Sequence, residues 1–140
     1  MIVYDAENQV VGRIASVIAK QLLEGETIFV VNCEKAVLAG NPKTKEKFYL
    51  QRVQRGDPLK GPFFPKYPDQ IFRRAVRGML PWDRARGRDA YRRLKVFIGV
   101  PEELKNKEKI RIEKADVSKL KGRHSTLEKI SLLIGAKKRW

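Results

Sequence analysis

The chain has 140 residues, the usual size of one globular domain, and 42% of them are hydrophobic, enough to form a sizeable core. Its 31 Lys and Arg against 16 Asp and Glu give a net charge of +15, more than solubility requires, which indicates a polyanionic partner. No run of about 18 apolar residues is present, so we expect neither a membrane span nor a membrane partner, and nucleic acid is the favoured polyanion.

The first forty residues predict a parallel β–α–β unit. Ile2–Tyr4 is a short apolar run, without the charged and apolar segments of a signal peptide, so we expect a cytoplasmic protein. From Val11 to Leu23 apolar side chains recur at helical spacing, and Gly25 follows as a C-terminal cap. Thr27–Val31 is apolar on both alternating faces, as in a buried parallel strand.

The middle of the chain predicts three further helices and a strand. The helices are expected over Lys43–Gln54, Asp69–Leu80 and Gly87–Leu94, and the strand over Val96–Ile98. Parallel sheets need helices to cover them, so the predicted class is α/β. Without repeats or low-complexity tracts, we expect one domain, residues 1–140, with a basic central excursion over about residues 41–95.

The remaining segments carry weaker signals. Gly56–Pro68 contains four prolines, which exclude regular structure there. Lys109–Glu113 alternates charged with apolar residues and predicts a weak strand. Ser125 and Glu128 form a capping box in front of a terminal helix that has an apolar face.

Positive charge is concentrated in one stretch. Asn41–Lys95 holds 16 basic and five acidic residues, and ten of the 14 arginines of the chain. The planar guanidinium of arginine can bind phosphate oxygens bidentately and stack on bases, whereas lysine is a hydrated point charge. The stretch therefore favours folded RNA as the partner.

The helix predicted over Asp69–Leu80 has an apolar side that leaves its arginines on another side. The ordinary alternative is a solvated face paired with carboxylates, for which this stretch has too few. We expect RNA contacts from the arginines here and in the next segment, and from a second group on the preceding helix. The first group is Arg73, Arg74, Arg77, Arg84, Arg86 and Arg88, and the second is Lys43, Lys45, Lys47, Arg52 and Arg55. Arg92 and Arg93 are expected to pair in part with Asp89.

Three aromatic residues within the basic stretch have an open role. Trp82 is more often a packing residue than a base-stacking one, and Phe63 and Phe64 can contact RNA, a protein or the core.

The usual catalytic and metal-binding motifs are missing from the sequence. Cys33 and His124 are the only residues of their kinds, so neither a disulfide nor a common zinc site can form. Gly40–Thr44 lacks the glycine that a phosphate loop needs before Lys43. Carboxylates in the basic stretch are isolated, with Asp69 expected as a helix N-cap and Asp89 in a first helical turn.

We therefore expect no enzymatic activity, cofactor, metal or small-molecule substrate. Two other functions stay open: an RNA-processing enzyme whose residues converge only in three dimensions, and a messenger-RNA-binding translational regulator that uses the same basic surface.

Four segments resemble the ribosomal protein L13 family, in the correct order over about residues 3–101: Asp5–Ser16, Val31–Val37, Arg77–Pro81 and Arg93–Pro101. The block Arg77–Pro81, Arg-Gly-Met-Leu-Pro, is the most specific. The resemblance implies a three-layer α/β/α fold around a short parallel sheet, and a structural role on ribosomal RNA of the large subunit beside neighbouring ribosomal proteins. The form of residues 94–97 and the terminal helix are closer to archaeal and eukaryotic members than to bacterial ones, and without the long helical extension typical of eukaryotic members we expect the archaeal form. The stretch after Pro101 matches the family only loosely.

Overall fold

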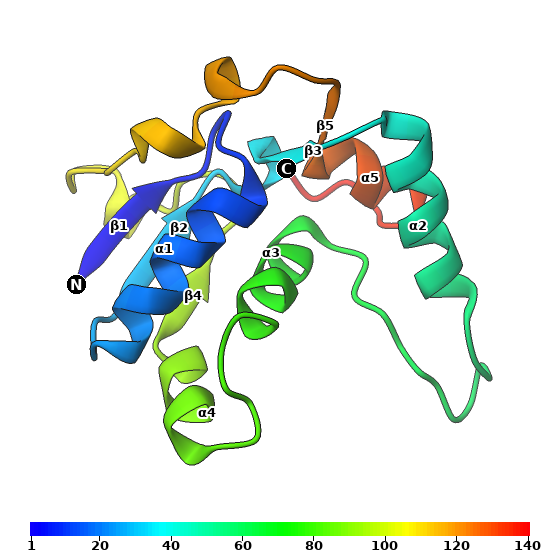
Figure 1. Ribbon diagram of the computed structural model, residues 1–140, viewed down its shortest axis with the longest axis horizontal. Helices are drawn as coiled ribbons and strands as arrows, with labels where there is room; N and C mark the ends of the chain where they lie inside the picture. The colour runs from blue at the N-terminus through cyan, green and yellow to red at the C-terminus, as the bar shows by residue number, and fades with distance from the viewer.

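The computed structural model describes residues 1–140 and contains five strands and five α-helices (Figure 1). In chain order these elements are β1 (Ile2–Asp5), α1 (Val11–Leu23), β2 (Ile28–Val31), β3 (Val37–Ala39), α2 (Pro42–Gln54), α3 (Pro68–Arg77), α4 (Ala85–Arg92), β4 (Leu94–Val96), β5 (His124–Thr126) and α5 (Leu127–Leu133). Four short 3-10 helices accompany them: η1 (Cys33–Lys35), η2 (Glu102–Leu104), η3 (Glu113–Ala115) and η4 (Val117–Lys119). None of the helices combines the length and apolar composition that crossing a membrane requires.

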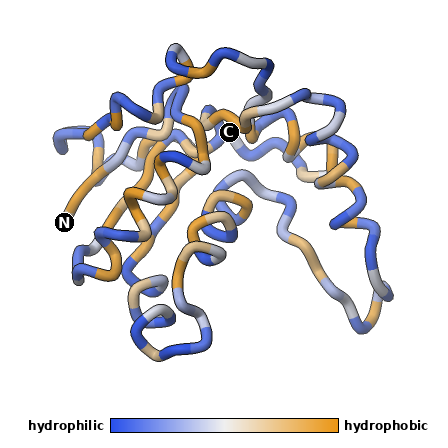
Figure 2. Tube along the Cα trace, in the orientation of Figure 1, coloured by the Kyte–Doolittle hydropathy of each residue, from blue (hydrophilic) through white to orange (hydrophobic).

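The main sheet is parallel and has the strand order β1-β2-β4. Helix α1 connects β1 to β2 and covers one face of the sheet, with α3 and α4 packed beside it (Figure 1). Side chains of this face, such as Ile28 and Leu94, meet Ile14, Ile18 and Phe72 in the main core. Apolar positions are accordingly concentrated on these strands and on the facing side of α1 (Figure 2).

The second face of the sheet carries a smaller apolar cluster. Val3, Val31 and Leu104 are buried there, and the rings of Phe29 and Phe97 stack with centroids 6.1 Å apart. The class predicted from the sequence, α/β around a short parallel sheet, is confirmed. The cover on this second face is thin, because it consists of η2 and the segment after β4 instead of a long helix.

A second, two-stranded sheet pairs β3 with β5 in antiparallel register and leads into α5. Helix α5 packs against η1 and α3, and α2 packs against α5. Helix α2 contributes no buried residue. The segment of residues 55–67 then runs away from the core and returns to α3, so α2 and this segment form an outer part of the molecule (Figure 1).

Several predicted element boundaries are wrong by a few residues. Helix α3 ends at Arg77 instead of Leu80, because Gly78 caps it and Pro81 follows soon after. Helix α4 ends at Arg92, and the next strand begins at Leu94 instead of Val96, since Leu94 pairs with Ile28 in the sheet. Tertiary strand pairing thus overrode the helical spacing near Leu94.

The strand predicted over Lys109–Glu113 is wrong. Only Ile110 pairs with Tyr4, as an isolated bridge, and Glu113 begins η3. The short alternation of charged and apolar residues there reflects an irregular segment beside the free edge of β1.

Three predicted capping roles also need correction. The N-cap of α5 is Thr126, whose hydroxyl accepts from the backbone N–H of Lys129, whereas Ser125 lies in β5. The N-cap position of α3 is Tyr67, and Asp69 lies in the first turn. Asp89 lies in the middle of α4, because that helix begins at Ala85. Ser125 is not the cap because it pairs with β3 as part of β5. Asp69 and Asp89 lie deeper in their helices than predicted because α3 and α4 begin earlier than expected.

Candidate nucleic-acid interface

Helix α3 presents three arginines beside its packed side. Ile71, Phe72 and Val76 are buried, which leaves the arginines at the helix flanks and outer surface. The guanidinium carbon of Arg73 lies 4.7 Å from the centroid of the Tyr91 ring, and that of Arg77 lies 4.2 Å from the Trp82 ring. Arg74 is exposed. The two ring contacts keep the faces of these guanidinium groups occupied and leave their edges for acceptors.

The segment between α3 and α4 places three more of the predicted residues. The side chains of Arg84 and Arg86 are exposed and make no hydrogen bond or ion pair within the protein. Arg88 donates to the backbone carbonyls of Trp82 and Asp83, at 3.1 and 3.4 Å. Arg88 therefore helps to hold the segment in place, whatever else it contacts.

Trp82 packs as expected for such a residue. Its ring meets Tyr91 edge-on, with centroids 5.1 Å apart. Tyr91 therefore contacts both Trp82 and Arg73 and links α4 to the arginines of α3.

Only one of the two arginines at the end of α4 pairs with Asp89. Arg92 lies 3.4 Å from its carboxylate. Arg93 instead donates to the backbone carbonyl of Leu22, at the end of α1. The predicted pairing of Arg93 with Asp89 is wrong because the Arg93 side chain reaches the last turn of α1 and donates there to a carbonyl that also accepts from the backbone N–H of Gly25.

The second predicted group lies on or directly after α2. Lys43, Lys47, Arg52 and Arg55 are exposed, and Lys45 is half-buried. Asn41 caps this helix by accepting from the backbone N–H of Lys43, and Pro42 occupies its first position. Arg52 lies 4.4 Å from the centroid of the Phe48 ring and 5.7 Å from that of Phe64.

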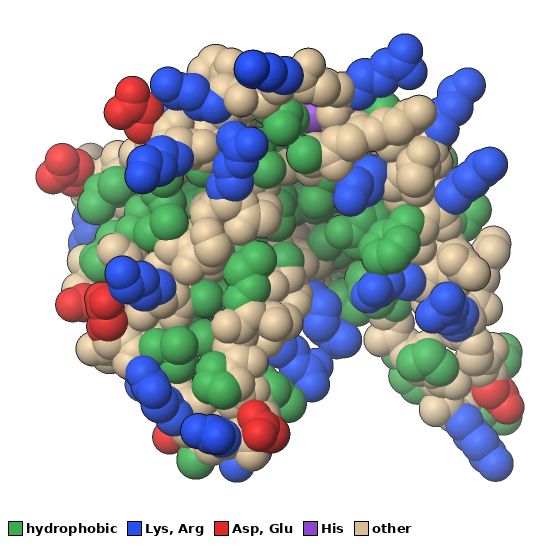
Figure 3. Space-filling model, viewed as in Figure 1, with side chains coloured by type: hydrophobic (Ala, Val, Ile, Leu, Met, Phe, Trp, Pro, Cys, Tyr) green, Lys and Arg blue, Asp and Glu red, His purple; other side chains and the backbone are tan.

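The two groups come together only in part. Arg52, Arg55 and Arg74 line one cavity of about 280 Å³, together with Pro62, Phe63 and Phe64. The three lysines lie in the first half of α2 and line none of the cavities around Phe64. Figure 3 shows the hollow between the main body and the outer part, with Lys and Arg side chains on both of its sides.

None of the eleven predicted residues forms a salt bridge. The five ion pairs of the structure join other residues, and Asp89 pairs with Arg92. The alternative of a basic face neutralised by neighbouring carboxylates is therefore excluded for these side chains. Their charge is uncompensated within the protein and available to a polyanion.

Three residues of this surface were missed by the sequence analysis. Gln70 and Tyr91 line the largest cavity of the region, and Lys66 lines an adjoining one. The signal for Tyr91 was its spacing from Gly87 and Ala90, which marks the packed side of α4. Gln70 and Lys66 carried no local signal, since only the return of the chain to α3 brings them to the hollow.

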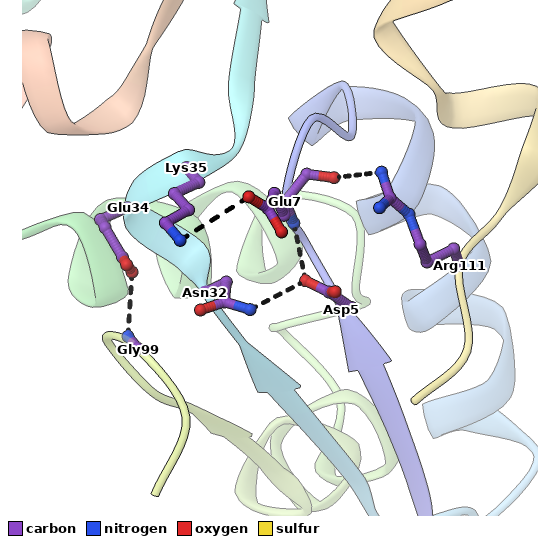
Figure 4. Close-up of polar contacts among 7 residues, drawn as sticks. All are labelled: Asp5, Glu7, Asn32, Glu34, Lys35, Gly99 and Arg111. Atoms are coloured by element: carbon purple, nitrogen blue, oxygen red, sulfur yellow. Dashed lines mark hydrogen bonds and ion pairs between the residues drawn. The ribbon is translucent and has the colours of Figure 1, made fainter. Parts of the chain in front are cut away.

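The carboxyl edge of the parallel sheet, where ligands of α/β proteins commonly bind, is filled by the protein itself (Figure 4). Asp5 accepts from the side chain of Asn32 and from the backbone N–H of Glu7. Buried Glu34 accepts from the backbone N–H of Gly99, at 3.0 Å. Asn32 has a left-handed backbone with φ 56°, which turns the chain after β2. These polar groups satisfy one another and fix the loops around the edge.

Lys35 and Arg111 complete this cluster by binding Glu7. The ammonium of Lys35 lies 3.6 Å from the Glu7 carboxylate, and Arg111 donates to the Glu7 backbone carbonyl at 2.7 Å (Figure 4). The cluster joins the loop after β1 to η1 and to the segment before η3. No group of three or more His, Cys, Asp or Glu side chains is arranged to hold a metal ion.

Cys33 lies in η1 and is fully buried. Burial raises the pKa of its thiol far above the ordinary value, and the neighbouring carboxylates of Glu34 and Asp69 raise this pKa further. The thiol is therefore neutral at physiological pH and unsuited to nucleophilic attack.

Comparison with known proteins agrees with the resemblance described from the residues. The family model described as ribosomal protein L13 matches residues 1–103. Relatives named large ribosomal subunit protein uL13 occur in Methanopyrus kandleri, Archaeoglobus fulgidus and Methanosarcina barkeri. The Methanopyrus kandleri protein is 55% identical over 84% of this chain and 76% of its own length. The Archaeoglobus fulgidus protein is 50% identical over 95% of this chain and 86% of its own length. The Methanosarcina barkeri protein is 50% identical over 98% of this chain and 99% of its own length.

These relatives are archaeal ribosomal proteins and not enzymes, which confirms the prediction that the sequence encodes a structural protein. The family match also covers every residue of the two predicted basic groups. The chain therefore belongs to the ribosomal protein L13 family, in its archaeal form.

Proposed function

We propose that this protein is a structural constituent of the large subunit of the cytoplasmic ribosome, where it binds ribosomal RNA through its arginine-rich surface and supports subunit assembly and translation. The observation that carries the proposal is the uncompensated charge of α2, α3 and the segment before α4, where none of the eleven predicted basic side chains is in a salt bridge. RNA suits such a surface because its closely spaced phosphates are neutralised by Lys and Arg side chains with release of counterions.

The arrangement of the arginines suits two RNA segments better than one. Arg73, Arg74 and Arg77 belong to α3, while Arg52 and Arg55 belong to the outer part, across the hollow. Phosphates bound on the two sides are neutralised and held at a fixed separation, so two RNA segments can approach each other without full repulsion. The protein acts as an electrostatic clamp, and no bond is made or broken.

Ring contacts prepare this surface for binding. Arg52, Arg73 and Arg77 each lie over an aromatic ring, which limits the side-chain freedom that is lost when a phosphate binds. Neighbouring ribosomal proteins are the second class of partner that we propose, on exposed apolar side chains outside the arginine surface, such as Leu132 and Leu133 of α5.

The proposal is tested by replacing Arg73, Arg74 and Arg77 together with alanine. We expect weaker binding to a large-subunit RNA fragment, and a plot of log affinity against log salt concentration whose slope falls by about 2 to 3, since up to three phosphate contacts are lost. Filter binding over a salt series measures both quantities.

A matched control removes three exposed lysines outside the basic stretch, Lys20, Lys105 and Lys121, with the same change in net charge. If this control lost as much affinity and slope as the arginine variant, the contact surface would be placed wrongly. The ribosomal role is tested separately: the protein is expected to co-sediment with large subunits through a high-salt wash. Its absence from them would favour a messenger-RNA-binding regulator.

A further inference from the structure

Four adjoining cavities surround Phe64 in the hollow between the main body and the outer part. The largest has a volume of about 380 Å³ and is lined by Phe63, Phe64 and Pro65 on one side and by Gln70, Arg73, Arg74 and Tyr91 on the other. Phe64 lines all four cavities, and Arg74 lines three of them. We call the space of these four cavities the aromatic hollow; it belongs to the gap between the two parts in Figure 3.

The lining of the aromatic hollow combines positive charge with aromatic rings. Four arginines and one lysine line it, and no carboxylate does: Arg52, Arg55, Arg73, Arg74 and Lys66. A neutral protein segment that filled this space would bury these five positive charges without supplying a counter-charge, which is costly. The charge therefore favours an anionic occupant.

Phe63 is the feature that separates this hollow from an ordinary basic groove. Its side chain is 70% exposed, although it lines three of the four cavities. Other aromatic side chains of the region have a partner on their rings: Phe64 with Tyr49, Phe48 with Tyr49, Trp82 with Tyr91, and Tyr67 with the guanidinium of Arg139. The Phe63 ring has no such partner, so its face is open to a planar ligand.

The opposite wall of the largest cavity offers complementary groups. The guanidinium of Arg73, which lies over the Tyr91 ring, lines this cavity and supplies positive charge. Gln70 and Tyr91 can both donate and accept hydrogen bonds at the edge of a base. Arg74 lies between this cavity and the one lined by Arg52 and Arg55, in position for a phosphate that follows the base.

We propose that the aromatic hollow takes an unpaired nucleotide of the bound RNA, with the base stacked on Phe63 and the adjoining phosphate bound by Arg74 and its neighbouring arginines. The inference rests on the proposed RNA-binding function and adds recognition of an extruded base to it. Bases inside a duplex offer no free face to an aromatic side chain, whereas unpaired bases of RNA commonly stack on one. A volume of about 380 Å³ is within the range of small-ligand sites, about 300 to 1,000 Å³.

The test uses the full chain and two RNA hairpins, each with a single 2-aminopurine at the same position. In one hairpin this base is unpaired, and in the other it is paired with uridine. We expect the wild-type protein to bind the unpaired probe more tightly, with quenching of its fluorescence on stacking. Phe63→Ala is expected to weaken binding of the unpaired probe about tenfold, the size of one lost base–aromatic stack, to abolish the quenching, and to leave the paired probe unchanged.

Two variants serve as controls. Phe63→Tyr keeps the ring and is expected to keep the preference for the unpaired probe. Leu59→Ala changes an 89% exposed side chain of the same segment that lines none of the four cavities, and is expected to change neither affinity.

The inference is overturned if wild type binds both probes equally, or if Phe63→Ala behaves like Leu59→Ala or weakens both probes alike. Its failure is distinguishable from failure of the proposed function. If the change of Arg73, Arg74 and Arg77 to alanine weakens both probes while Phe63→Ala weakens neither, RNA binding by the surface stands and base stacking is excluded. If the arginine change weakens neither probe, the proposed function itself fails.

Discussion

The arginines of this protein differ in what their side chains contact, and that contact decides what each can still bind. Arg88 and Arg93 donate to backbone carbonyls, so they stabilise the segment before α4 and the end of α1. Arg52 and Arg77 lie over rings, which use the face of the guanidinium and leave its N–H groups free. Arg74 has no polar partner and is exposed. We therefore expect RNA contact to be easiest for the arginines that lie over rings and for Arg74.

Gly87 shows how closely the segment before α4 approaches that helix. A Cβ added at Gly87 would overlap the backbone oxygen of Pro81. We expect Gly87→Ala to lower the free energy of unfolding by about 2 kcal/mol, because backbone atoms must move. Urea denaturation measures the change.

Gly12 provides the matched control, since it also lies in the first turn of a helix and an added Cβ there meets nothing within 4 Å. Gly12→Ala is expected to raise the free energy of unfolding by about 0.5 kcal/mol through helix propensity and reduced freedom of the unfolded chain. Equal effects of the two substitutions would contradict the close approach at Gly87.

Helix α2 is the only α-helix without a buried residue, so local interactions contribute a larger share of its stability than in the other α-helices. The side chain of Asn41 accepts from the backbone N–H of Lys43 at 3.1 Å and is its N-cap. We expect Asn41→Ala to cost about 1 kcal/mol of local helix stability, which is about fivefold faster amide exchange within α2. Hydrogen exchange measures this, with the amides of α1 unchanged.

Asn41→Asp keeps an acceptor at the same position and is expected to retain slow exchange in α2. Because α2 contributes no buried residue, the urea midpoint of the whole protein is expected to change little in either variant. Loss of global stability equal to the local loss would show that α2 is more strongly coupled to the core than its packing indicates.

At the scale of the whole molecule, the buried core and the outer part with its exposed arginines occupy different regions of the structure. Buried residues of the main core come from the segments before Gly40 and after Tyr67, while residues 41–67 contribute only partly buried side chains such as Tyr49, Val53 and Phe64. The outer part can therefore carry exposed arginines and a free phenylalanine without weakening the core. This arrangement is what the proposed RNA-binding surface requires.

Buried acidic groups make the stability of the whole protein sensitive to high pH. Burial raises the pKa of the Cys33 thiol and of the Tyr4 and Tyr49 hydroxyls above their ordinary values. A raised folded-state pKa favours the neutral form, so the stabilisation is fully present below the unfolded-state pKa and is lost as pH rises toward the folded-state pKa. The free energy of unfolding should fall above about pH 8.5 through Cys33, and more steeply above about pH 10 through the tyrosines.

Cys33→Ala isolates the contribution of the thiol. Between about pH 8.5 and 10, the wild type is expected to lose up to about 1.4 kcal/mol per pH unit more than this variant, which has no thiol to ionise in the unfolded chain. Guanidinium denaturation at a series of pH values measures the difference, and other titrating groups cancel in the comparison. Parallel pH profiles would contradict a buried neutral thiol.

The sequence by itself determined the fold class, the single concentration of positive charge and the family. Apolar spacing in residues 11–23 and the doubly apolar strand at residues 27–31 were sufficient because each signal is local and the helix matches its prediction residue for residue. The arginine-rich stretch was equally visible, since charge density needs no knowledge of contacts.

Only the tertiary structure decided which element Leu94 joins, which residue caps α5 and what each arginine contacts. Leu94 fits a helix by its spacing but pairs with Ile28, and Ser125 fits a cap but is paired in β5. Arg93 and Arg74 are alike in sequence, yet one reaches the carbonyl of Leu22 while the other lines the aromatic hollow. These outcomes depend on tertiary contacts between segments far apart in the chain, and the local spacing of residues carries no information about such contacts.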